Sequence, residues 1–327
     1  MEPLLQVEDL TIAFVEDNTQ TVVVDKAGFS VKSGEVICIV GESGCGKSVT
    51  ALSLLGLLSP NARIIDGSII FEGKDLLKMN EKELDGIRGS EATMVFQDVM
   101  NSLNPVLTIG NQLTEIIRIH MGYDRKKANE YAIEMIKKVG LPDAKAVMKK
   151  YPHMLSGGMQ QRVMIAIALA CGPKLIIADE PTTALDVTIQ LQIMKLLVEL
   201  QKEFHMSILL ITHDIGLVAE LADRVIIMYA GQFMEEAPVN QLFDHPSHPY
   251  TRALLESVPC IYDDPDKKLS SIPGTVPDNY QDIEGCRFFG RCSYGIPACK
   301  EKQVYSELEE GHFVRCHRAV KEEIPFV

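Results

Sequence analysis

The sequence predicts an α/β fold built on a mostly parallel sheet, and three observations carry this prediction. An apolar run at residues 36–40 passes directly into a glycine-rich turn, after which a helical pattern begins. A second apolar run, at 175–178, ends in two carboxylates. Between residues 158 and 229, predicted helices alternate with short buried strands, an order that produces right-handed parallel connections within one sheet.

The first forty residues predict short strands. Their residue pattern favours strands at 7–14, 21–24, 28–32 and 35–40. The segment from Val36 to Val40 is apolar without a break, as expected for a strand that is buried on both faces of a parallel sheet. We expect the next helix to begin at Ser48 and to end near Leu58, because Ser59 and Pro60 stop it.

The middle of the chain predicts a helical insertion between about 100 and 157, clearest at 112–121 and 126–139. The alternation then resumes, with helices predicted at 158–170, 187–204 and 216–222 and strands at 175–178, 207–211 and 224–229. From Pro238 onward, prolines separate short segments. This shift in composition predicts a domain boundary and a loop-rich C-terminal region.

Length, composition and charge exclude several classes of protein. The 327 residues are 46% hydrophobic and 24% charged, which is enough for a real core and argues against disorder or a coiled coil. The formal charge of −13 argues against a protein that holds nucleic acid by broad phosphate neutralisation. No apolar run reaches the roughly 18 residues of a membrane-spanning helix, and the start of the chain lacks signal-peptide features. We therefore expect the chain to stay in the cytosol.

Residues 41–48 fit the phosphate-binding loop pattern between a buried strand and a helix. The residues are Gly41, Glu42, Ser43, Gly44, Cys45, Gly46, Lys47 and Ser48. Glycines let backbone N–H groups curl around a phosphate, and the helix N-terminus adds partial positive charge. Lys47 is expected to reach the β- and γ-phosphates and Ser48 to bind Mg²⁺. The alternative is a glycine-rich turn of an unrelated α/β protein.

Two carboxylates, Asp179 and Glu180, end the second buried strand. Carboxylates at the end of a core strand indicate a functional role, because burying an unpaired charge is unfavourable. We expect Asp179 to hold Mg²⁺ through water and Glu180 to orient and deprotonate an attacking water. A solvated strand end is the alternative interpretation.

The helix before that strand begins with a segment that contains two adjacent glycines: Ser156, Gly157, Gly158, Met159, Gln160. Ser156 suits the N-cap position, and two glycines without Cβ atoms let a helix end approach an anion closely. An ordinary capped helix is the alternative. Here the sequence resembles an ATP-binding cassette (ABC) protein, whose LSGGQ signature precedes the acidic strand. Met159 stands where the family has Gln.

Other residues match the family in the expected order, and the resemblance implies their roles. Gln97 corresponds to the Q-loop, which touches Mg²⁺ or water and leads into the segment that faces the membrane partner. The segment from Ala184 to Asp186 corresponds to the D-loop, with Asp186 as its acidic residue. His213 corresponds to the switch histidine at the γ-phosphate, and Phe14 to the aromatic residue that stacks on adenine.

The resemblance implies a composite ATP site. In the family, ATP is clamped between the phosphate loop of one cassette and the signature helix of another, so that hydrolysis requires two cassettes. It also implies a parallel core sheet, an N-terminal antiparallel β subdomain and a helical subdomain. We place the cassette at 1–237, with the helical subdomain at about 100–157.

The C-terminal region is similar to that of the ATPases of oligopeptide and dipeptide permeases. The match rests on the stretch from His245 to Leu255 and on Ile272-Pro273-Gly274, and it is closest to the D-type subunit. We place this small cysteine-containing domain at 238–327. The implied partners are an F-type ATPase, with a homodimer as an alternative in isolation, two transmembrane permease subunits and, indirectly, an external peptide-binding protein, on the cytoplasmic face of the membrane. Nickel or another small solute is an alternative cargo, and action on DNA or ribosomes is a more distant alternative.

Four cysteines gather in the tail: Cys286, Cys292, Cys299 and Cys316. Their spacing lacks the tight pairs typical of structural zinc, and four thiolates are able to hold an iron–sulfur cluster. The resemblance favours a [4Fe-4S] cluster. Zn²⁺, with His312 or His317 as substitute ligands, and free buried thiols remain the alternatives. Core or loop roles are expected for Cys38, Cys45 and Cys171, and Cys260 is unassigned.

Overall fold

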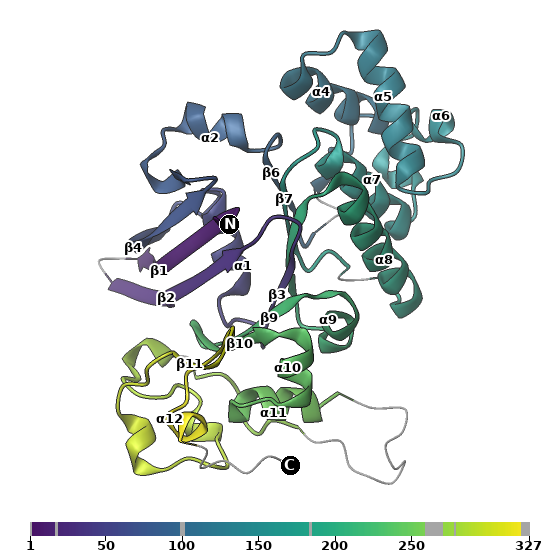
Figure 1. Ribbon diagram of the computed structural model, residues 1–327. Helices are drawn as coiled ribbons and strands as arrows, with labels where there is room; N and C mark the ends of the chain where they lie inside the picture. The colour runs from purple at the N-terminus through teal and green to yellow at the C-terminus, as the bar shows by residue number, and fades with distance from the viewer. Residues whose placement is uncertain are drawn as a thin grey trace. The chain divides into compact units, whose positions relative to one another are not determined.

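The computed structural model describes residues 2–16, 19–98, 102–182, 185–258, 271–277 and 279–321 (Figure 1). The chain divides into two compact units. The first contains Met1–Pro3, Val31–Glu35 and Lys78–Leu210, and the second contains Leu4–Ser30, Val36–Leu77 and Ile211–Val327. Each unit is therefore assembled from three separate stretches of the sequence.

The first unit contains a short parallel sheet. β6 (Ala92–Val95) and β7 (Leu175–Asp179) pair in parallel, and β8 (Ser207–Thr212), whose first four residues belong to this unit, follows beside β7. Every residue of the three strands is buried. The sequence predicted β7 and β8 from their apolar runs. It did not predict β6, a strand of only four residues that includes Thr93.

Helices make up most of the rest of the first unit (Figure 1). α4 packs against α5 and α7, α5 also contacts α6 and α7, and α7 packs on β6 and α8. The predicted helical insertion is thus present, and its two clearest helices begin within three residues of their expected starts. The bounds are α2 (Glu81–Ile87), α4 (Ile109–Met121), α5 (Arg125–Lys138), α6 (Ala144–Val147), η2 (Pro152–Met154), α7 (Gly157–Leu169) and α8 (Val187–Phe204).

Side-chain caps explain where five of these helices begin. Each capping side chain accepts a hydrogen bond from the backbone N–H three residues further on, and the caps are Asn80, Thr108, Asp124, Asp143 and Asp186. A cap of this kind satisfies one of the N–H groups that a helix start leaves without an intrahelical partner. The predicted start of the first insertion helix was three residues late because Thr108 was not recognised as its cap.

The second unit begins with an antiparallel sheet in the order β2 (Thr19–Val31), β1 (Leu5–Glu16), β4 (Ala62–Phe71) and β5 (Lys74–Asp75). β2 merges the strands predicted at 21–24 and 28–32, with Lys26 at a φ of 50° in its middle. β4 was not predicted, because its centre is exposed and contains Asp66 and Gly67, which interrupt the apolar pattern. Its Gly67 approaches β1 so closely that a Cβ would lie 2.6 Å from the Glu8 carbonyl oxygen.

A second set of strands in this unit follows the order β3 (Val36–Val40), β9 (Arg224–Tyr229), β10 (Gln232–Pro238), β12 (His312–Val314) and β11 (Ser306–Glu309). β3 and β9 are parallel, and the pairs from β9 to β11 are antiparallel. The two last strands in the chain thus extend a sheet that begins with predicted core strands. The helices of the unit are α1 (Lys47–Leu54), η1 (Leu76–Lys78), α9 (Ile215–Leu221), α10 (Val239–Asp244), α11 (Pro249–Glu256), η3 (Tyr280–Asp282), η4 (Phe289–Arg291), η5 (Pro297–Lys300) and α12 (His317–Val320).

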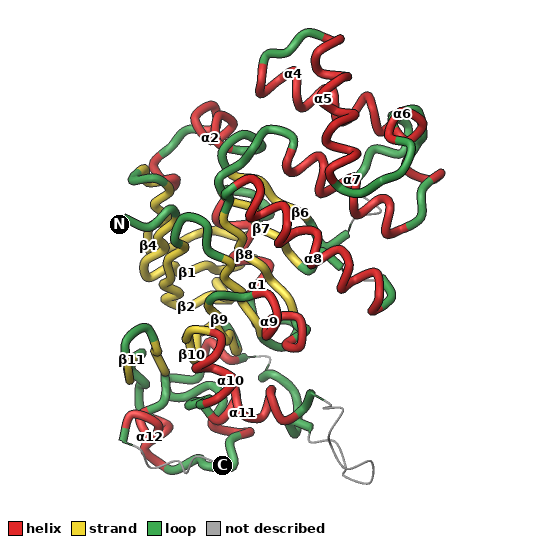
Figure 2. The backbone as a smooth tube through the Cα atoms, turned by 45° about the vertical axis from the view of Figure 1, so that its right-hand side comes forward, coloured by secondary structure: helices red, strands yellow, loops and turns green. Residues whose placement is uncertain are grey.

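The C-terminal region is joined to this unit by buried polar contacts and is not a compact unit of its own. Glu235 of β10 is fully buried and accepts hydrogen bonds from the backbone N–H groups of Ser247 and His248 and from the His312 ring. Arg287 pairs with Asp25 at 2.7 Å. Figure 2 shows that most of the described chain after α11 is loop, so these contacts substitute for regular structure. No helix in the described part of the chain has the length and apolarity needed to cross a membrane.

Candidate functional site

The loop at 41–48 has the backbone of a phosphate cradle and lies in the second unit. It leaves the fully buried strand β3 and enters α1, whose N-cap is Gly46. Gly44 and Gly46 have φ values of 78° and 107°, which residues with side chains rarely adopt. A Cβ on Gly41 would lie 2.1 Å from the carbonyl oxygen of Met228, so that β9 also requires a glycine there.

Lys47 is held inside this loop. Its side chain is buried, and Nζ donates to the carbonyl oxygens of Gly41 at 2.8 Å and Glu42 at 3.0 Å. Both acceptors are neutral backbone groups that do not compensate the charge of the ammonium, so this charge can attract an anion bound in the loop. Ser43 and Gly44 are exposed at the loop surface, and Ser48 is half-buried in the first turn of α1.

The thiol of Cys45 is unreactive because it is buried, although the residue lies in the loop. Burial raises the pKa of its thiol, and the nearby Lys47 lowers it by less. The thiol therefore stays protonated near neutral pH, and protonated thiols are poor nucleophiles. The role of Cys45 as a phosphate-loop residue stays a prediction.

Two more predicted residues belong to the second unit. Phe14 is half-buried near the end of β1, where it pairs with Ala62 of β4. His213 is exposed between β8 and α9, directly before Asp214, which caps α9 through the N–H groups of Gly216 and Leu217. Their proposed contacts with nucleotide remain predictions.

The acidic pair lies in the first unit, at the end of β7. Asp179 is 5% exposed, and Glu180 follows it with a φ of 43°, a left-handed conformation that is uncommon for glutamate. The carboxylate of Glu180 accepts a hydrogen bond from Nε2 of Gln97 at 2.9 Å. Two residues that were predicted separately, 83 positions apart, are thus in direct contact. Strain of this kind is typical of functional positions.

The signature segment packs closely on the D-loop and α8 in the same unit. A Cβ on Gly158 would lie 2.9 Å from Cγ2 of Ile189, and one on Gly157 would lie 3.3 Å from Cδ2 of Leu185. Ser156 occupies the N-cap position of α7 as predicted, yet its side chain makes no capping hydrogen bond. Packing within the chain therefore leaves little room for a side chain at Gly158, and Gly157 is also in a close contact, in addition to any role toward an anion.

Gln160 and Met159 differ in exposure. Gln160 is buried, and its Nε2 donates to the carbonyl oxygens of Pro152 and Leu155, so that its amide supports the turn before α7. Met159 is half-buried. In the D-loop, Asp186 caps α8, whereas Ala184 lies outside the described residues.

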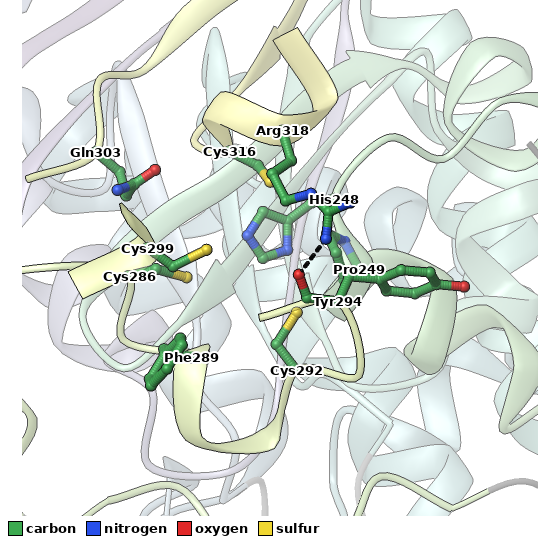
Figure 3. Close-up of a pocket in the computed structure, with 10 residues that line it drawn as sticks. All are labelled: His248, Pro249, Cys286, Phe289, Cys292, Tyr294, Cys299, Gln303, Cys316 and Arg318. Carbon is green, nitrogen blue, oxygen red and sulfur yellow. Dashed lines mark hydrogen bonds between the residues drawn. The ribbon is translucent and has the colours of Figure 1, made fainter. Parts of the chain in front are cut away.

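Four tail cysteines line one cavity of the second unit (Figure 3). Cys286, Cys292, Cys299 and Cys316 share it with His248, Pro249, Phe289, Tyr294, Gln303 and Arg318. Backbone bonds order these cysteines, since the N–H of Cys286 donates to the carbonyl oxygen of Cys299 at 2.8 Å. The sequence predicted this gathering, although 30 positions separate the first cysteine from the last. It did not predict His248 in the cavity.

Burial favours the neutral forms of three of these thiols and of His248. Burial raises the pKa of Cys286 to about 12, and it raises the pKa of Cys292 and of Cys316. Burial also lowers the pKa of His248 to about 4. Among the described residues, no group of three or more His, Cys, Asp and Glu side chains is arranged to hold a single metal ion.

The remaining cysteines have other surroundings. Cys38 is fully buried in β3, where burial raises the pKa of its thiol further than the nearby Asp223 does. Cys171 is half-buried after α7, and burial raises its pKa as well. Cys260 lies outside the described residues.

Residues of the tail also contact the phosphate loop, and no sequence pattern predicted these contacts. Tyr250 and Arg291 both contact Glu42, across 208 and 249 positions of sequence. No spacing rule connects residues so far apart in the chain.

Comparisons with known proteins agree with this geometry. The family model described as ABC transporter matches residues 24–183, and the one described as oligopeptide/dipeptide transporter, C-terminal region, matches residues 234–299. The oligopeptide transport ATP-binding protein AppD of Bacillus subtilis (strain 168) is 50% identical over 318 residues, 97% of this chain and 97% of the relative. The dipeptide transport ATP-binding protein DppD of Escherichia coli (strain K12) is 46% identical over 315 residues, 96% of each chain.

Solved structures match as well. A dimeric ATP-binding cassette in a post-hydrolysis state, bound to ADP and phosphate, has a TM-score of 0.64 and 28% identity, and the match covers 72% of this chain and 98% of the other. A component of an ABC transporter complex from Clostridium perfringens has a TM-score of 0.64 and 29% identity, over 75% of this chain and 92% of the other.

Proposed function

Because the chain belongs to the ATP-binding proteins of ABC transporters, in their oligopeptide and dipeptide branch, we propose that it hydrolyses ATP to drive uptake of dipeptides or oligopeptides. The observation that carries this proposal is similarity along the whole chain. Relatives named for dipeptide and oligopeptide transport match over 96% or more of their length, and the C-terminal family model matches as well. A cassette from another branch would match over the cassette alone.

The residues of the loop bind and orient the triphosphate. Lys47 exchanges its two carbonyl partners for the β- and γ-phosphates, and Ser48 and Asp179 supply oxygen ligands suited to Mg²⁺. Bound Mg²⁺ neutralises charge on the phosphates. The exposed backbone at Ser43 and Gly44 offers N–H groups to them. Phe14 stacks on the adenine ring.

Glu180 accepts the proton of the attacking water, and Gln97 orients that carboxylate through the bond that already joins them. His213 contacts the γ-phosphate. Phosphoryl transfer depends mostly on position and charge stabilisation, so these contacts account for the chemistry.

A second cassette completes the site. Ser156, Gly157 and Gly158, with Met159, contact the nucleotide held by the partner cassette, while Asp186 lies at the seam between the two. Support comes from the similar cassette that is a dimer bound to ADP and phosphate. We infer an F-type ATPase as the partner, two permease subunits in the membrane and a position on its cytoplasmic face. Along the sequence, we propose a cassette at 1–237 followed by a C-terminal region at 238–327.

We propose that the four-cysteine cavity binds an iron–sulfur cluster. The four thiols line a single cavity. A [4Fe-4S] cluster takes one thiolate at each of four corners, so four cysteines around one cavity supply its full set of ligands. When bound, the cluster supplies cross-links between chain segments that contain little regular structure. The cysteines would bind as thiolates, since a bound metal displaces their protons.

Uptake of labelled substrates tests the cargo. Cells that lack the gene should lose uptake of labelled dipeptide, and a plasmid copy should restore it, whereas a Lys47→Ala copy should not. Unchanged peptide uptake together with lost nickel uptake would transfer the assignment to a nickel importer. Salt-sensitive binding of the purified chain to DNA or ribosomes, without either transport defect, would contradict a transport role.

Elemental analysis tests the cluster. Protein purified without oxygen should contain iron and inorganic sulfide in equal amounts, and a variant with all four cysteines changed to serine should contain neither. Zinc in place of iron, or the same iron content in the serine variant, would contradict the proposal.

A further inference from the structure

Two residues of the C-terminal region, Tyr250 and Arg291, hold the phosphate loop at Glu42. Its backbone N–H donates to the hydroxyl of Tyr250 at 3.0 Å. Its two carboxylate oxygens accept from Nη1 of Arg291 at 3.0 and 2.9 Å. Its carbonyl oxygen accepts from Lys47. The backbone and the side chain of this one loop residue are thereby fixed at the same time.

Arg291 is itself firmly placed. Its side chain is 9% exposed, and Nε donates to the carbonyl oxygen of Pro273 at 2.7 Å. Nη2 donates to the carbonyl oxygen of Gly274 at 3.1 Å, and Nη1 also donates to the hydroxyl of Tyr229 at 3.3 Å. A guanidinium with its donors satisfied in this way acts as a rigid point of attachment.

Tyr250 is equally fixed. It is fully buried, and its ring packs on Tyr229 and Phe288 with centroid distances of 4.6 and 5.2 Å. Its hydroxyl therefore meets the loop from a rigid aromatic cluster. Tyr250 is the second residue of α11, and Phe288 immediately precedes η4, which ends at Arg291.

The charge of Glu42 gives this arrangement a consequence for ligand binding. A carboxylate in a phosphate loop repels a triphosphate, and its partial burial reduces screening by water. Arg291 compensates that charge and fixes the orientation of the Glu42 carboxylate. We propose that Arg291, assisted by Tyr250, is a positioning residue for MgATP: it fixes the position of Glu42 in the loop and compensates the charge of its carboxylate. This inference rests on the proposed ATP site.

Binding of MgATP to the full-length chain tests the proposal. In Arg291→Gln the Kd should rise about tenfold, since the uncompensated carboxylate then faces the phosphates. Arg291→Lys, which keeps the charge and loses the planar fork, should give an intermediate Kd. Arg315→Gln is the matched control, because Arg315 is another arginine of the tail and its Nε donates to the carbonyl oxygen of Phe233. This substitution should change the Kd by less than about twofold.

A double variant separates charge compensation from a general structural effect. Adding Glu42→Gln to Arg291→Gln removes the repulsion, so the Kd should return part of the way to that of the wild type. Equal Kd values in Arg291→Gln and the wild type, or an additive loss in the double variant, would overturn the proposal. Should Arg291→Gln fail to fold, Tyr250→Phe keeps the ring packing and should raise the Kd by itself. Failure of the wild type to bind MgATP would instead contradict the proposed function.

A separate observation concerns His248 in the four-cysteine cavity. The ring is 1% exposed and lines the cavity (Figure 3). Its Nδ1 accepts a hydrogen bond from the backbone N–H of Tyr250 at 3.0 Å, so Nδ1 carries no proton. A neutral imidazole then carries its proton on Nε2. Among the described residues, Nε2 is buried and has no hydrogen-bond partner.

A buried N–H donor without a partner is energetically unfavourable, so we expect an acceptor for Nε2 in this cavity, which the four cysteines also line. We infer that Nε2–H of His248 donates to a sulfur atom of the group bound in this cavity. Hydrogen bonds to the sulfurs of a cluster stabilise its more negative, reduced form and so raise its reduction potential. This inference rests on the proposed cluster and concerns His248 alone.

Redox titration of the anaerobic full-length protein tests this second inference. His248→Asn retains an oxygen that can accept from the Tyr250 N–H, so the helix cap is kept, whereas its shorter side chain places no N–H at the position of Nε2. Its midpoint potential should be lower than that of the wild type. His245→Asn, an exposed histidine three residues earlier, should leave the potential unchanged. An unchanged potential in His248→Asn would overturn the inference, as would a wild type that contains no iron and sulfide.

Discussion

The phosphate loop and the acidic pair are positioned in different ways. The loop residue Glu42 is fixed by Tyr250 and Arg291, which lie 208 and 249 positions away in the sequence. Glu180 is fixed by its own left-handed backbone and by Gln97, 83 positions away in the same unit. The geometry of the loop therefore depends on the tail of the chain, whereas that of the acidic pair depends on the cassette itself. Changes in the tail should accordingly alter ATP binding and leave the chemistry of the bound nucleotide intact.

The largest expected effect separates chemistry from binding. Glu180→Gln keeps the hydrogen-bonding shape at the end of β7 and removes the base, so kcat for ATP hydrolysis should fall by about 100-fold or more. The Kd for MgATP should stay close to the wild-type value, and ATP-bound dimers should accumulate. Phosphate release and size-exclusion chromatography measure the two effects. Undiminished hydrolysis would remove Glu180 from the catalytic role.

The next effect tests how strictly local packing places the signature helix. Gly158→Val should lower the free energy of unfolding by about 2 kcal/mol, because its side chain would meet Ile189. Urea denaturation measures this loss. Adding Ile189→Ala should recover part of it, since the second change makes room for the new side chain. No recovery in the double variant would show that the two positions do not compete for space.

A smaller effect tests the dependence of the loop on the tail. Cys292 directly follows Arg291, so Cys292→Ser should loosen that residue and raise the Kd for MgATP by about threefold, equivalent to about 0.7 kcal/mol. In an Arg291→Gln background the same change should have little further effect. Titration with a fluorescent ATP analogue measures both. Cys171→Ser, outside the tail, is the control, and an equal rise in that variant would contradict the coupling.

The smallest effect concerns the loop thiol. Burial raises the pKa of Cys45 above its ordinary value of 9.0, so its reactive thiolate forms only at a pH above that value. Alkylation by iodoacetamide, followed by mass spectrometry, should therefore be slow at pH 7 to 9 in the folded protein. It should be fast in urea at the same pH. Rapid labelling of folded protein at pH 7 would show that Lys47 dominates over burial.

The motifs could be identified from the sequence because each acts through neighbouring residues. A glycine-rich turn between an apolar strand and a helix has the same backbone chemistry wherever it occurs, and two carboxylates after a buried strand imply a task. The predicted helices were also close to their observed bounds, since apolar periodicity reports which helix face is buried. β4 was missed for the complementary reason: the exposed Asp66 and Gly67 in its centre interrupt this pattern.

By itself, then, the sequence determined the apolar strands β3, β7, β8 and β9, the longer helices, the phosphate loop, the acidic pair, the signature segment and the four tail cysteines, because each of these is specified by short-range chemistry. Only the tertiary structure decided that Arg291 and Tyr250 hold Glu42, that Gln97 contacts Glu180 and that His248 faces the four thiols. These contacts join residues far apart in the chain, and no local propensity encodes which distant side chains meet once the core has packed.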